Sequence, residues 1–198
     1  MESNLTTRQR QALKTKETIL KCAMQLVSDV GFDKITINSI CKKAGVSIGS
    51  FYYHFKSLDF IIIESYKAVD SYFENLDKSG YFNIDPINRI NLIIKEQLKY
   101  AVSEGVDIIT QFYKSQLTVG TEYFISTDRY LPKLIMNSII EAQKDELLNT
   151  SLSPLEITAD VLTISRGIIY DWCLKQGDFN LSKRGCKLVS IYIKSLHT

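Results

Sequence analysis

The sequence predicts an all-α protein, and three observations carry that prediction. The 198 residues include only three prolines and nine glycines, which favours long uninterrupted helices. Apolar residues recur at spacings of three and four, as in the series Ile19, Ala23, Leu26 and Val30, which is the period of an amphipathic helix. No credible sheet segment lies between such series. We therefore expect nine to ten helices.

The first of these helices is expected to end at Gly31, because glycine tolerates the backbone conformation of a helix C-terminus. Thr36 can cap a second helix through its hydroxyl group. Ser57 and Asp59 suit the start of a further helix, since a serine oxygen accepts helix N–H groups and a carboxylate complements the positive helix end. The apolar series that follows predicts one long helix from Leu58 to Leu76.

The rest of the chain is also expected to be helical. After a polar connector, Pro86 suits the first turn of the next helix, because that position needs no N–H. Gly105 and Gly177 are expected helix ends. An irregular aromatic stretch is expected at about 120–130. The helices are then expected at about 86–104, 107–116, 132–148, 154–176 and 182–196.

The segment from Thr36 to Lys56 predicts two short helices around a tight turn. Ile37 and Ile40 give the first helix an apolar side, and Gly45 allows a left-handed turn that a residue with a Cβ resists. Ser47 can cap the second helix. Its inward-facing residues are one turn apart: Phe51 and Phe55.

The other residues of the second helix are left on an outer face: Ile48, Gly49, Ser50, Tyr52 and Tyr53, with His54 and Lys56 at its far end. That layout is typical of a helix-turn-helix, here at about 36–55, whose second helix enters the DNA major groove. Up to Lys56 the chain has nine Lys/Arg against four Asp/Glu, whereas the remainder has fifteen against eighteen. A basic N-terminal third fits a nucleic-acid-binding module. We expect a DNA-binding domain at 1–56 and a second helical domain at 57–198.

The same segment resembles the N-terminal pattern of the tetracycline-repressor (TetR) family of transcription regulators. The matching positions are Gly31, Phe32, Thr36, Ile40, Cys41, Ala44, Gly45, Val46, Ser47, Gly49, Ser50, Phe51, Tyr52, Tyr53, His54, Phe55 and Lys56. The resemblance covers roughly the first third of the chain, and beyond it extends to length, helical character and the placing of the last two helices. It implies a homodimer that binds a palindromic operator in double-stranded DNA and responds to a small-molecule effector.

The resemblance implies which residues contact DNA. Phosphate contacts are expected from Thr36, Tyr53, His54 and Lys56, and from the basic N-terminal residues Arg8, Arg10, Lys14 and Lys16. Base contacts are expected from Ser47, Ile48, Ser50 and Tyr52, with Gly49 allowing close approach; Tyr52 could instead be a packing residue. Ile48 could meet a thymine methyl group, but it also takes a position where Lys or Arg could contact guanine, so the base preference stays open.

The resemblance implies that the domain at 57–198 is an effector-binding and dimerisation domain, with a dimer interface and an effector pocket. The last two long helices are expected to pack against those of a second copy through Ile164, Ile168, Trp172, Val189 and Ile193. An apolar or aromatic effector is expected to contact Tyr66, Phe73, Tyr100, Phe112, Tyr113, Tyr123 and Phe124. In both cases the alternative is that these residues form an ordinary core, because aromatic residues at helical spacing are also typical of cores.

Other functions are disfavoured by composition. Two histidines, no phosphate-binding glycine loop and no paired carboxylates argue against an enzyme. Four cysteines without CxxC spacing predict reduced thiols, no metal site and no cofactor. No apolar run approaches the roughly 18–20 residues that span a bilayer, and no secretory signal is visible, so we expect a cytoplasmic protein without membrane contact. The function we expect is therefore that of a DNA-binding transcriptional repressor, released from its operator by a small apolar or aromatic effector. The alternative is a helical protein–protein adaptor that has lost DNA binding.

Overall fold

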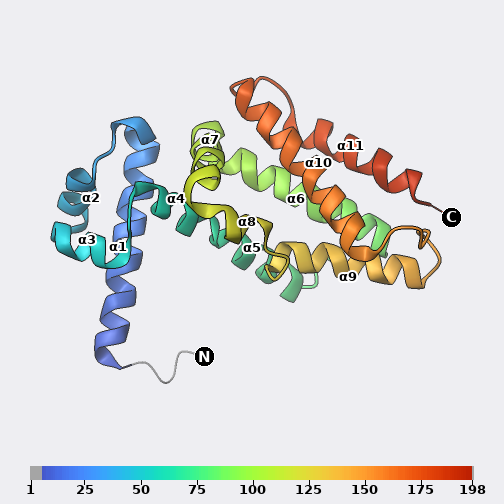
Figure 1. Cartoon of the computed structure of the whole chain (residues 1–198), viewed down its shortest axis with the longest axis horizontal. Helices are drawn as coiled ribbons and strands as arrows, with labels where there is room; N and C mark the ends of the chain where they lie inside the picture. Colours follow the sequence, from blue (N-terminus) through green and yellow to red (C-terminus); the bar gives the residue numbers. More distant parts are fainter. Residues whose placement is uncertain (1–5, 198) are drawn as a thin grey trace. The chain divides into compact units, whose positions relative to one another are not determined.

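The computed structural model describes residues 6–197, without the side chains of residues 118, 120 and 121. Over these residues the protein is all-helical, which confirms the predicted fold class (Figure 1). The α-helices are α1 (Thr7–Val30), α2 (Ile37–Ala44), α3 (Ile48–His54), α4 (Leu58–Tyr66), α5 (Ala68–Lys78), α6 (Pro86–Glu104), α7 (Val106–Ser115), α8 (Thr121–Ile125), α9 (Tyr130–Lys144), α10 (Pro154–Leu174) and α11 (Leu181–Ser195). A 3-10 helix, η1 (Phe32–Lys34), follows α1, and a π-helical stretch, η2 (Gln116–Gly120), follows α7.

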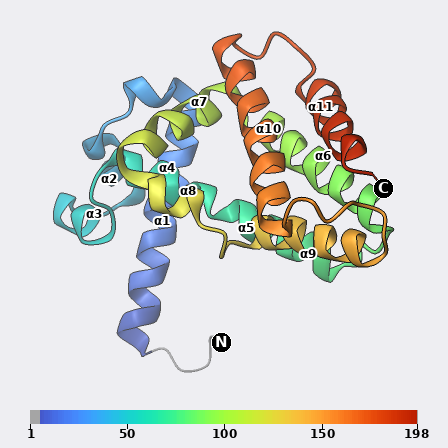
Figure 2. The same ribbon diagram turned by 45° about the vertical axis from the view of Figure 1, so that its right-hand side comes forward.

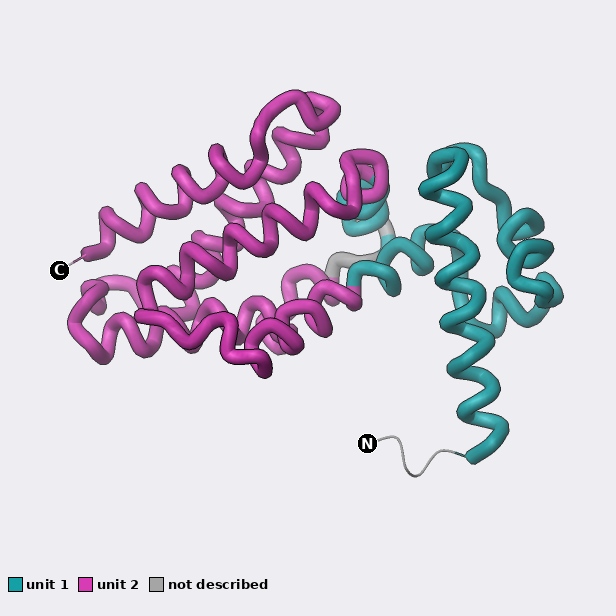
Figure 3. Tube along the Cα trace, turned by 180° about the vertical axis from the view of Figure 1, so that it is seen from behind, with its two compact units in different colours: residues 1–66, 111–121 teal, residues 67–110, 122–198 magenta. Residues whose placement is uncertain are grey.

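The chain forms two compact units, coloured separately in Figure 3. Unit 1 comprises the residues up to Tyr66 together with Gln111–Thr121, and unit 2 comprises Lys67–Thr110 and Glu122–Thr198. The N-terminal unit therefore extends past Lys56 and includes α4. The chain passes between the units after Tyr66, within α7 and near the start of α8.

The core of unit 1 forms where α1 packs against α2 and α4. Ile19, Ala23 and Val27 are buried on α1, at successive spacings of four. The expected series ended at Val30 instead, but Val30 is 45% exposed. Val30 lies on the same side of α1 as Ile19 and Ala23, so its exposure follows from its place as the last residue of the helix, next to the Gly31 cap.

The predicted long helix from Leu58 to Leu76 is wrong, because the helix is interrupted at Lys67. The N–H of Asp70 bonds to the Lys67 carbonyl three residues back, which is a tighter turn than an α-helix makes. The two halves also bury their apolar residues in different units. Ser57 does not act as the expected cap, because its buried Oγ finds no hydrogen-bond partner among the described residues.

Unit 2 is a helical layer structure in which α6 lies beside α9 and α11, and α10 packs on both α9 and α11 (Figures 1 and 2). Local signals start these helices. Asp85 caps α6 before Pro86, and Ser153 forms a reciprocal capping box with Glu156 at the start of α10. Fully buried core residues come from all four helices: Ile90, Ile94, Leu98, Ile135, Ile139, Ile157, Val161 and Val189.

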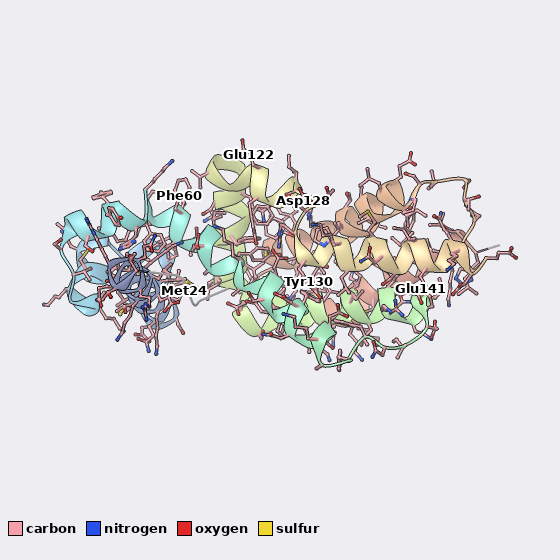
Figure 4. The ribbon with its side chains drawn as sticks, turned by 90° about the horizontal axis from the view of Figure 1, so that it is seen from below. Met24, Phe60, Glu122, Asp128, Tyr130 and Glu141 are labelled. Atoms are coloured by element: carbon pink, nitrogen blue, oxygen red, sulfur yellow. The ribbon has the colours of Figure 1, made fainter. Side chains whose placement is uncertain are left out.

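Polar contacts fix α9 within this unit. Tyr130, labelled in Figure 4, begins α9 and donates its hydroxyl hydrogen to Asp77 at 2.6 Å. Burial and this hydrogen bond raise the pKa of Tyr130 to about 12, so it remains protonated at neutral pH. Glu141, further along α9, pairs with Arg89 of α6 at 2.5 Å. Among the helices between residues 6 and 197, none combines the length and the apolar character that crossing a membrane requires.

Candidate nucleic-acid interface

Helix α2 is fixed at both ends by the residues that predict it. The Thr36 side chain accepts from the Ser39 N–H at 3.1 Å, and the Ser39 hydroxyl accepts from the Thr36 N–H at 3.0 Å. This capping box confirms Thr36 as the helix cap, so the Thr36 hydroxyl is already engaged within the protein. At the other end, Gly45 adopts the left-handed conformation with φ of 67°.

The turn after Gly45 orients α3. The Val46 N–H bonds to the Cys41 carbonyl at 3.0 Å, and the Cys41 thiol lies 3.8 Å from the Ser47 carbonyl oxygen. Ser47 then caps α3 by accepting from the Ser50 N–H at 3.1 Å. These contacts hold the two helices in the geometry of a helix-turn-helix.

Helix α3 has a buried side and an exposed side. Phe51 is fully buried and Phe55 is 3% exposed, with ring centroids 5.8 Å apart. On the other side, Ile48 is 49% exposed, Tyr52 is 54% exposed and Tyr53 is 78% exposed. Ser47 and Gly49 are exposed as well, and Ser50 is half-buried. The inner and outer faces therefore agree with the prediction, and Tyr52 is not a core residue.

His54 and Lys56 lie at the far end of this surface. The His54 ring packs edge-on against Tyr53 at 4.9 Å, and the Lys56 ammonium lies 5.6 Å from the Phe60 ring centroid. Burial, with a smaller effect from the nearby Lys16 charge, lowers the pKa of His54 below its ordinary value. His54 is therefore neutral at pH 7 in the free protein, and one ring nitrogen can donate a hydrogen bond to a phosphate.

The basic N-terminal residues Arg8, Arg10, Lys14 and Lys16 lie on the helix α1. Thr6 caps this helix in a reciprocal arrangement with Gln9, and Arg8 and Lys14 are exposed on its first turns. Lys16 differs from them, because its ammonium pairs with Glu64 of α4 at 2.7 Å. That ion pair connects α1 to α4 within unit 1, so the charge of Lys16 is already paired inside the protein.

The aromatic residues expected around an effector are divided between the two units. In unit 1, Tyr66 stacks on Phe112 with ring centroids 3.6 Å apart, and Tyr113 packs edge-on against Phe112 at 6.1 Å. In unit 2, Phe73 is fully buried and stacks on Phe82. These rings therefore belong to separate clusters.

The other expected effector residues in unit 2 lie in two further groups. Tyr100 packs against Tyr72 at 5.2 Å. Tyr123 and Phe124 of α8 pack edge to face at 5.8 Å, and the Arg129 guanidinium lies 4.3 Å from the Tyr123 ring centroid. The Tyr123 hydroxyl donates to Asp70 at 2.7 Å, so this residue is part of a polar cluster.

Most residues expected at the dimer interface lie in the core of the single chain. Ile168 is 5% exposed, Trp172 6%, Val189 0% and Ile193 1%, while Ile164 is half-buried. The sequence pattern identified the apolar stripe correctly, but that stripe packs against α6 and α9 of the same chain. The exposed apolar side chains of these two helices are different ones: Leu155, Tyr170 and Leu174 on α10, and Leu188 and Ile191 on α11.

Two polar features of unit 2 were not predicted from the sequence. Asp70 accepts from Tyr123, from the Arg129 guanidinium at 2.9 Å and from the Leu131 N–H. Gln97 of α6 is 5% exposed, and its Oε1 has no hydrogen-bond partner among the described residues. Asp70 and Arg129 are 59 residues apart, so no local sequence signal connects them.

A buried carboxylate in α6 was missed as well. Glu96 is 5% exposed and accepts from the hydroxyls of Tyr72 and Tyr81, both at 3.1 Å, and from the Lys99 ammonium at 2.7 Å. Burial alone would raise the pKa of Glu96, but these three donors outweigh it and the pKa is lowered. Glu96 is therefore a satisfied structural charge.

Taken with the fold, the exposed face of α3 defines a helix-turn-helix DNA-binding protein. Residues 19–61 match the model of the family described as bacterial regulatory proteins, tetR family. Residues 19–61 therefore form a DNA-binding domain of the TetR family, and the chain as a whole is similar to transcriptional regulators of that family, which are not enzymes.

Similarity to known proteins extends over nearly the whole chain. The HTH-type transcriptional regulator AcrR of Shigella flexneri is 24% identical over 203 residues, covering 93% of this chain and 90% of that protein. A TetR transcription regulator from Haloarcula marismortui has the same fold, with a TM-score of 0.71, 18% identity, and coverage of 93% and 99% of the two chains. Thermus thermophilus FadR, a TetR family repressor in complex with lauroyl-CoA, gives a TM-score of 0.70 at 16% identity and covers 88% and 92%.

Proposed function

We propose that the protein is a homodimeric repressor that binds a palindromic operator and is released from it by a small apolar or aromatic effector. The observation that carries this proposal is the exposed outer face of α3, where Ile48, Tyr52 and Tyr53 are held out from a buried Phe51–Phe55 anchor. Ile48, Tyr52 and Tyr53 keep about half or more of their surface exposed on so short a helix, which supports contact with a major groove.

Most of the affinity is expected to come from phosphates. Each Lys or Arg that neutralises a phosphate releases counterions, so affinity should fall steeply as salt is raised. Lys56, at the end of α3, and Tyr53 and His54 beside it form the proposed phosphate-contacting end of the surface. Arg8 and Lys14 on the first turns of α1 add positive charge to the same unit.

The DNA-binding proposal is tested by fluorescence anisotropy with the intergenic DNA upstream of the gene, across a series of salt concentrations. Lys56→Ala should weaken binding and reduce the slope of log K against log salt by about 1. Lys144→Ala removes an exposed lysine from the last turn of α9 in unit 2 and serves as the matched control, for which we expect an unchanged slope. Equal slopes for the two variants would contradict the phosphate role of Lys56, and no binding to any DNA at low salt would contradict the function.

Exposed apolar residues on α10 and α11 support the proposed homodimer. Tyr170 is 52% exposed and Leu174 62%, one turn apart on α10; Leu188 is 40% exposed and Ile191 55%, one turn apart on α11. Each pair therefore lies on one side of its helix, and these helices pack side by side. A twofold interface would cover such surfaces on both copies.

The dimer is tested by light scattering coupled to size-exclusion chromatography. Ile191→Glu and Leu174→Glu should produce monomers, because each places a charge in a face that a second copy would cover. Val102→Glu replaces a similarly exposed residue of α6, at 49%, and should leave the mass unchanged. A wild-type protein that is monomeric at all concentrations would refute this part of the proposal.

The effector proposal is supported by Gln97, a buried amide on α6. A buried amide oxygen without a partner is costly, and a ligand that donates a hydrogen bond to it would remove that cost. The lauroyl chain of the acyl-CoA bound to the Thermus thermophilus relative is apolar, as we propose for the effector here. Such a ligand must favour one conformation of the protein to release DNA.

The effector is tested with a panel of acyl-CoAs and substituted phenols, using thermal stability and operator affinity as paired measurements. A ligand of the proposed kind should raise the melting temperature and lower operator affinity. Gln97→Leu removes the unpaired oxygen, so we expect unchanged or higher stability without ligand and a smaller ligand response.

The repressor role is tested separately by deleting the gene. Deletion should raise transcription of the adjacent genes; a fall in their transcription would indicate an activator.

A further inference from the structure

The outer face of α3 has an unusual composition for DNA recognition. Its residues from Ile48 to His54 include no Arg, Lys, Asn or Gln. Those are the side chains that make bidentate contacts to guanine or adenine in the major groove. The helix therefore lacks the side chains that usually distinguish guanine from adenine, and its polar side-chain groups are hydroxyls and one imidazole.

An apolar surface is present instead. Ile48 and Tyr52 are separated by four residues, so they lie on the same side of α3, and they are exposed to similar extents of 49% and 54%. The Ile48 side chain begins the helix directly after the Ser47 cap. In the major groove, the C5-methyl group of thymine is the apolar feature that such a surface can contact.

Gly49, next to Ile48, is not required by the fold. A Cβ at this position would meet one atom within 4 Å, the Ser47 Oγ at an ordinary 3.8 Å. Alanine would therefore fit, and it is the better helix former. The missing side chain leaves space on the exposed surface beside Ile48, where DNA can approach the helix backbone closely.

We propose that Ile48 contacts a thymine methyl group in each operator half-site, and that Gly49 permits the close approach this contact needs. The proposal rests on the DNA-binding function given above and names the base feature that the function uses. Specificity at this position then comes from one methyl group, which both thymine and 5-methylcytosine present and uracil and cytosine do not.

The experiment removes that methyl group without changing base pairing. Selection from random duplexes first gives the preferred half-site, and each thymine in it is then replaced in turn by deoxyuridine. For wild-type protein, one replacement should reduce affinity about three- to tenfold, which is the expected effect of losing one buried methyl contact. Ile48→Ala should lose the same factor on the thymine operator and show no further loss on the uracil operator. Ile84→Ala, which replaces a 40% exposed isoleucine of unit 2, is the control and should behave as wild type.

The outcomes separate this inference from the proposed function. The methyl contact is refuted if specific binding is found but no uracil replacement weakens it. It is also refuted if Ile48→Ala and the replacement lower affinity independently. In both cases the proposed DNA-binding function is unaffected. If no duplex is preferred, the function itself fails. Gly49→Ala provides a second measurement, since it should preserve or raise the melting temperature and weaken binding to the selected operator; unchanged affinity would overturn the role of Gly49.

Discussion

Gly185 of α11 is the position where the smallest change should have the clearest effect on the fold. An alanine Cβ at this site would lie 2.5 Å from Leu98 Cδ1 and 3.2 Å from Ile168 Cγ2. Carbon atoms in contact normally lie about 3.5–4.0 Å apart. Leu98 is fully buried on α6 and Ile168 is 5% exposed on α10, so neither can turn out to solvent to make room.

Two opposing effects determine the magnitude. Overpacking of a filled core costs about 1–3 kcal/mol. Alanine is a better helix former than glycine by about 0.8–1.0 kcal/mol, which offsets part of that cost. We therefore expect Gly185→Ala to lower the free energy of unfolding by about 1 kcal/mol, and the melting temperature by about 2–4 °C for a chain of this size.

Gly167 of α10 offers a matched control of the opposite sign. It is an exposed helical glycine, and an added Cβ would meet no atom within 4 Å. Gly167→Ala should therefore raise the stability of the subunit by about 0.5–1 kcal/mol through helix propensity. Urea unfolding followed by far-UV circular dichroism measures both variants, at one protein concentration and after their molecular masses have been shown to agree.

A double variant tests the contact itself. Leu98→Ala alone should cost about 2–5 kcal/mol by leaving a cavity. In the Gly185→Ala protein that cost should be smaller by about 1 kcal/mol, because the added methyl group fills part of the cavity. Equal stabilisation by the alanines at 185 and 167, or strictly additive effects of the pair, would refute the packing argument.

Further expectations concern two polar sites. Because the pKa of His54 is lowered in the free protein by burial and Lys16, a phosphate contact should raise it again. Operator affinity, measured at constant ionic strength, should then rise as pH falls through the DNA-bound pKa and level off below the free pKa, whereas His54→Gln should give a flat profile. Asp70→Asn should lower the free energy of unfolding by about 3 kcal/mol, because Arg129 is 8% exposed and loses its paired charge. Asp128→Asn, in a surface pair with Lys133, should cost less than about 0.5 kcal/mol in the same unfolding assay, and similar losses for the two would contradict the burial argument.

The sequence was sufficient for features that depend on neighbouring residues. The Thr36 cap, the left-handed Gly45 and the Ser47 cap are each set within four residues of chain, and all three are present in the structure. The same holds for Pro86 at the start of α6. These signals determine where helices begin and end, so the outer face of α3 could be predicted from the sequence.

Features that depend on distant residues could not be predicted in this way. An apolar stripe shows that a helix face is buried but not whether its own chain or a second copy covers it, which is why Val189 and Ile193 were expected at an interface and lie in the core. The break at Lys67 coincides with the boundary between the two units, which only contacts between distant residues define. The pairing of Asp70 with Arg129 spans 59 residues, and neither neighbourhood contains a signal for it.

Asp70 and Tyr123 lie close to two places where the chain passes between the units, after Tyr66 and near the start of α8. Their 2.7 Å hydrogen bond joins α5 to α8 within unit 2. We expect this bond to break if the proposed effector displaces α8. Tyr123→Phe removes this bond but keeps the ring beneath Arg129, so we expect unchanged operator affinity without ligand and an altered effector response. Tyr130→Phe loses an equivalent bond to Asp77 and is the control. An identical effector response in the two variants would show that the Asp70–Tyr123 bond has no special part in release.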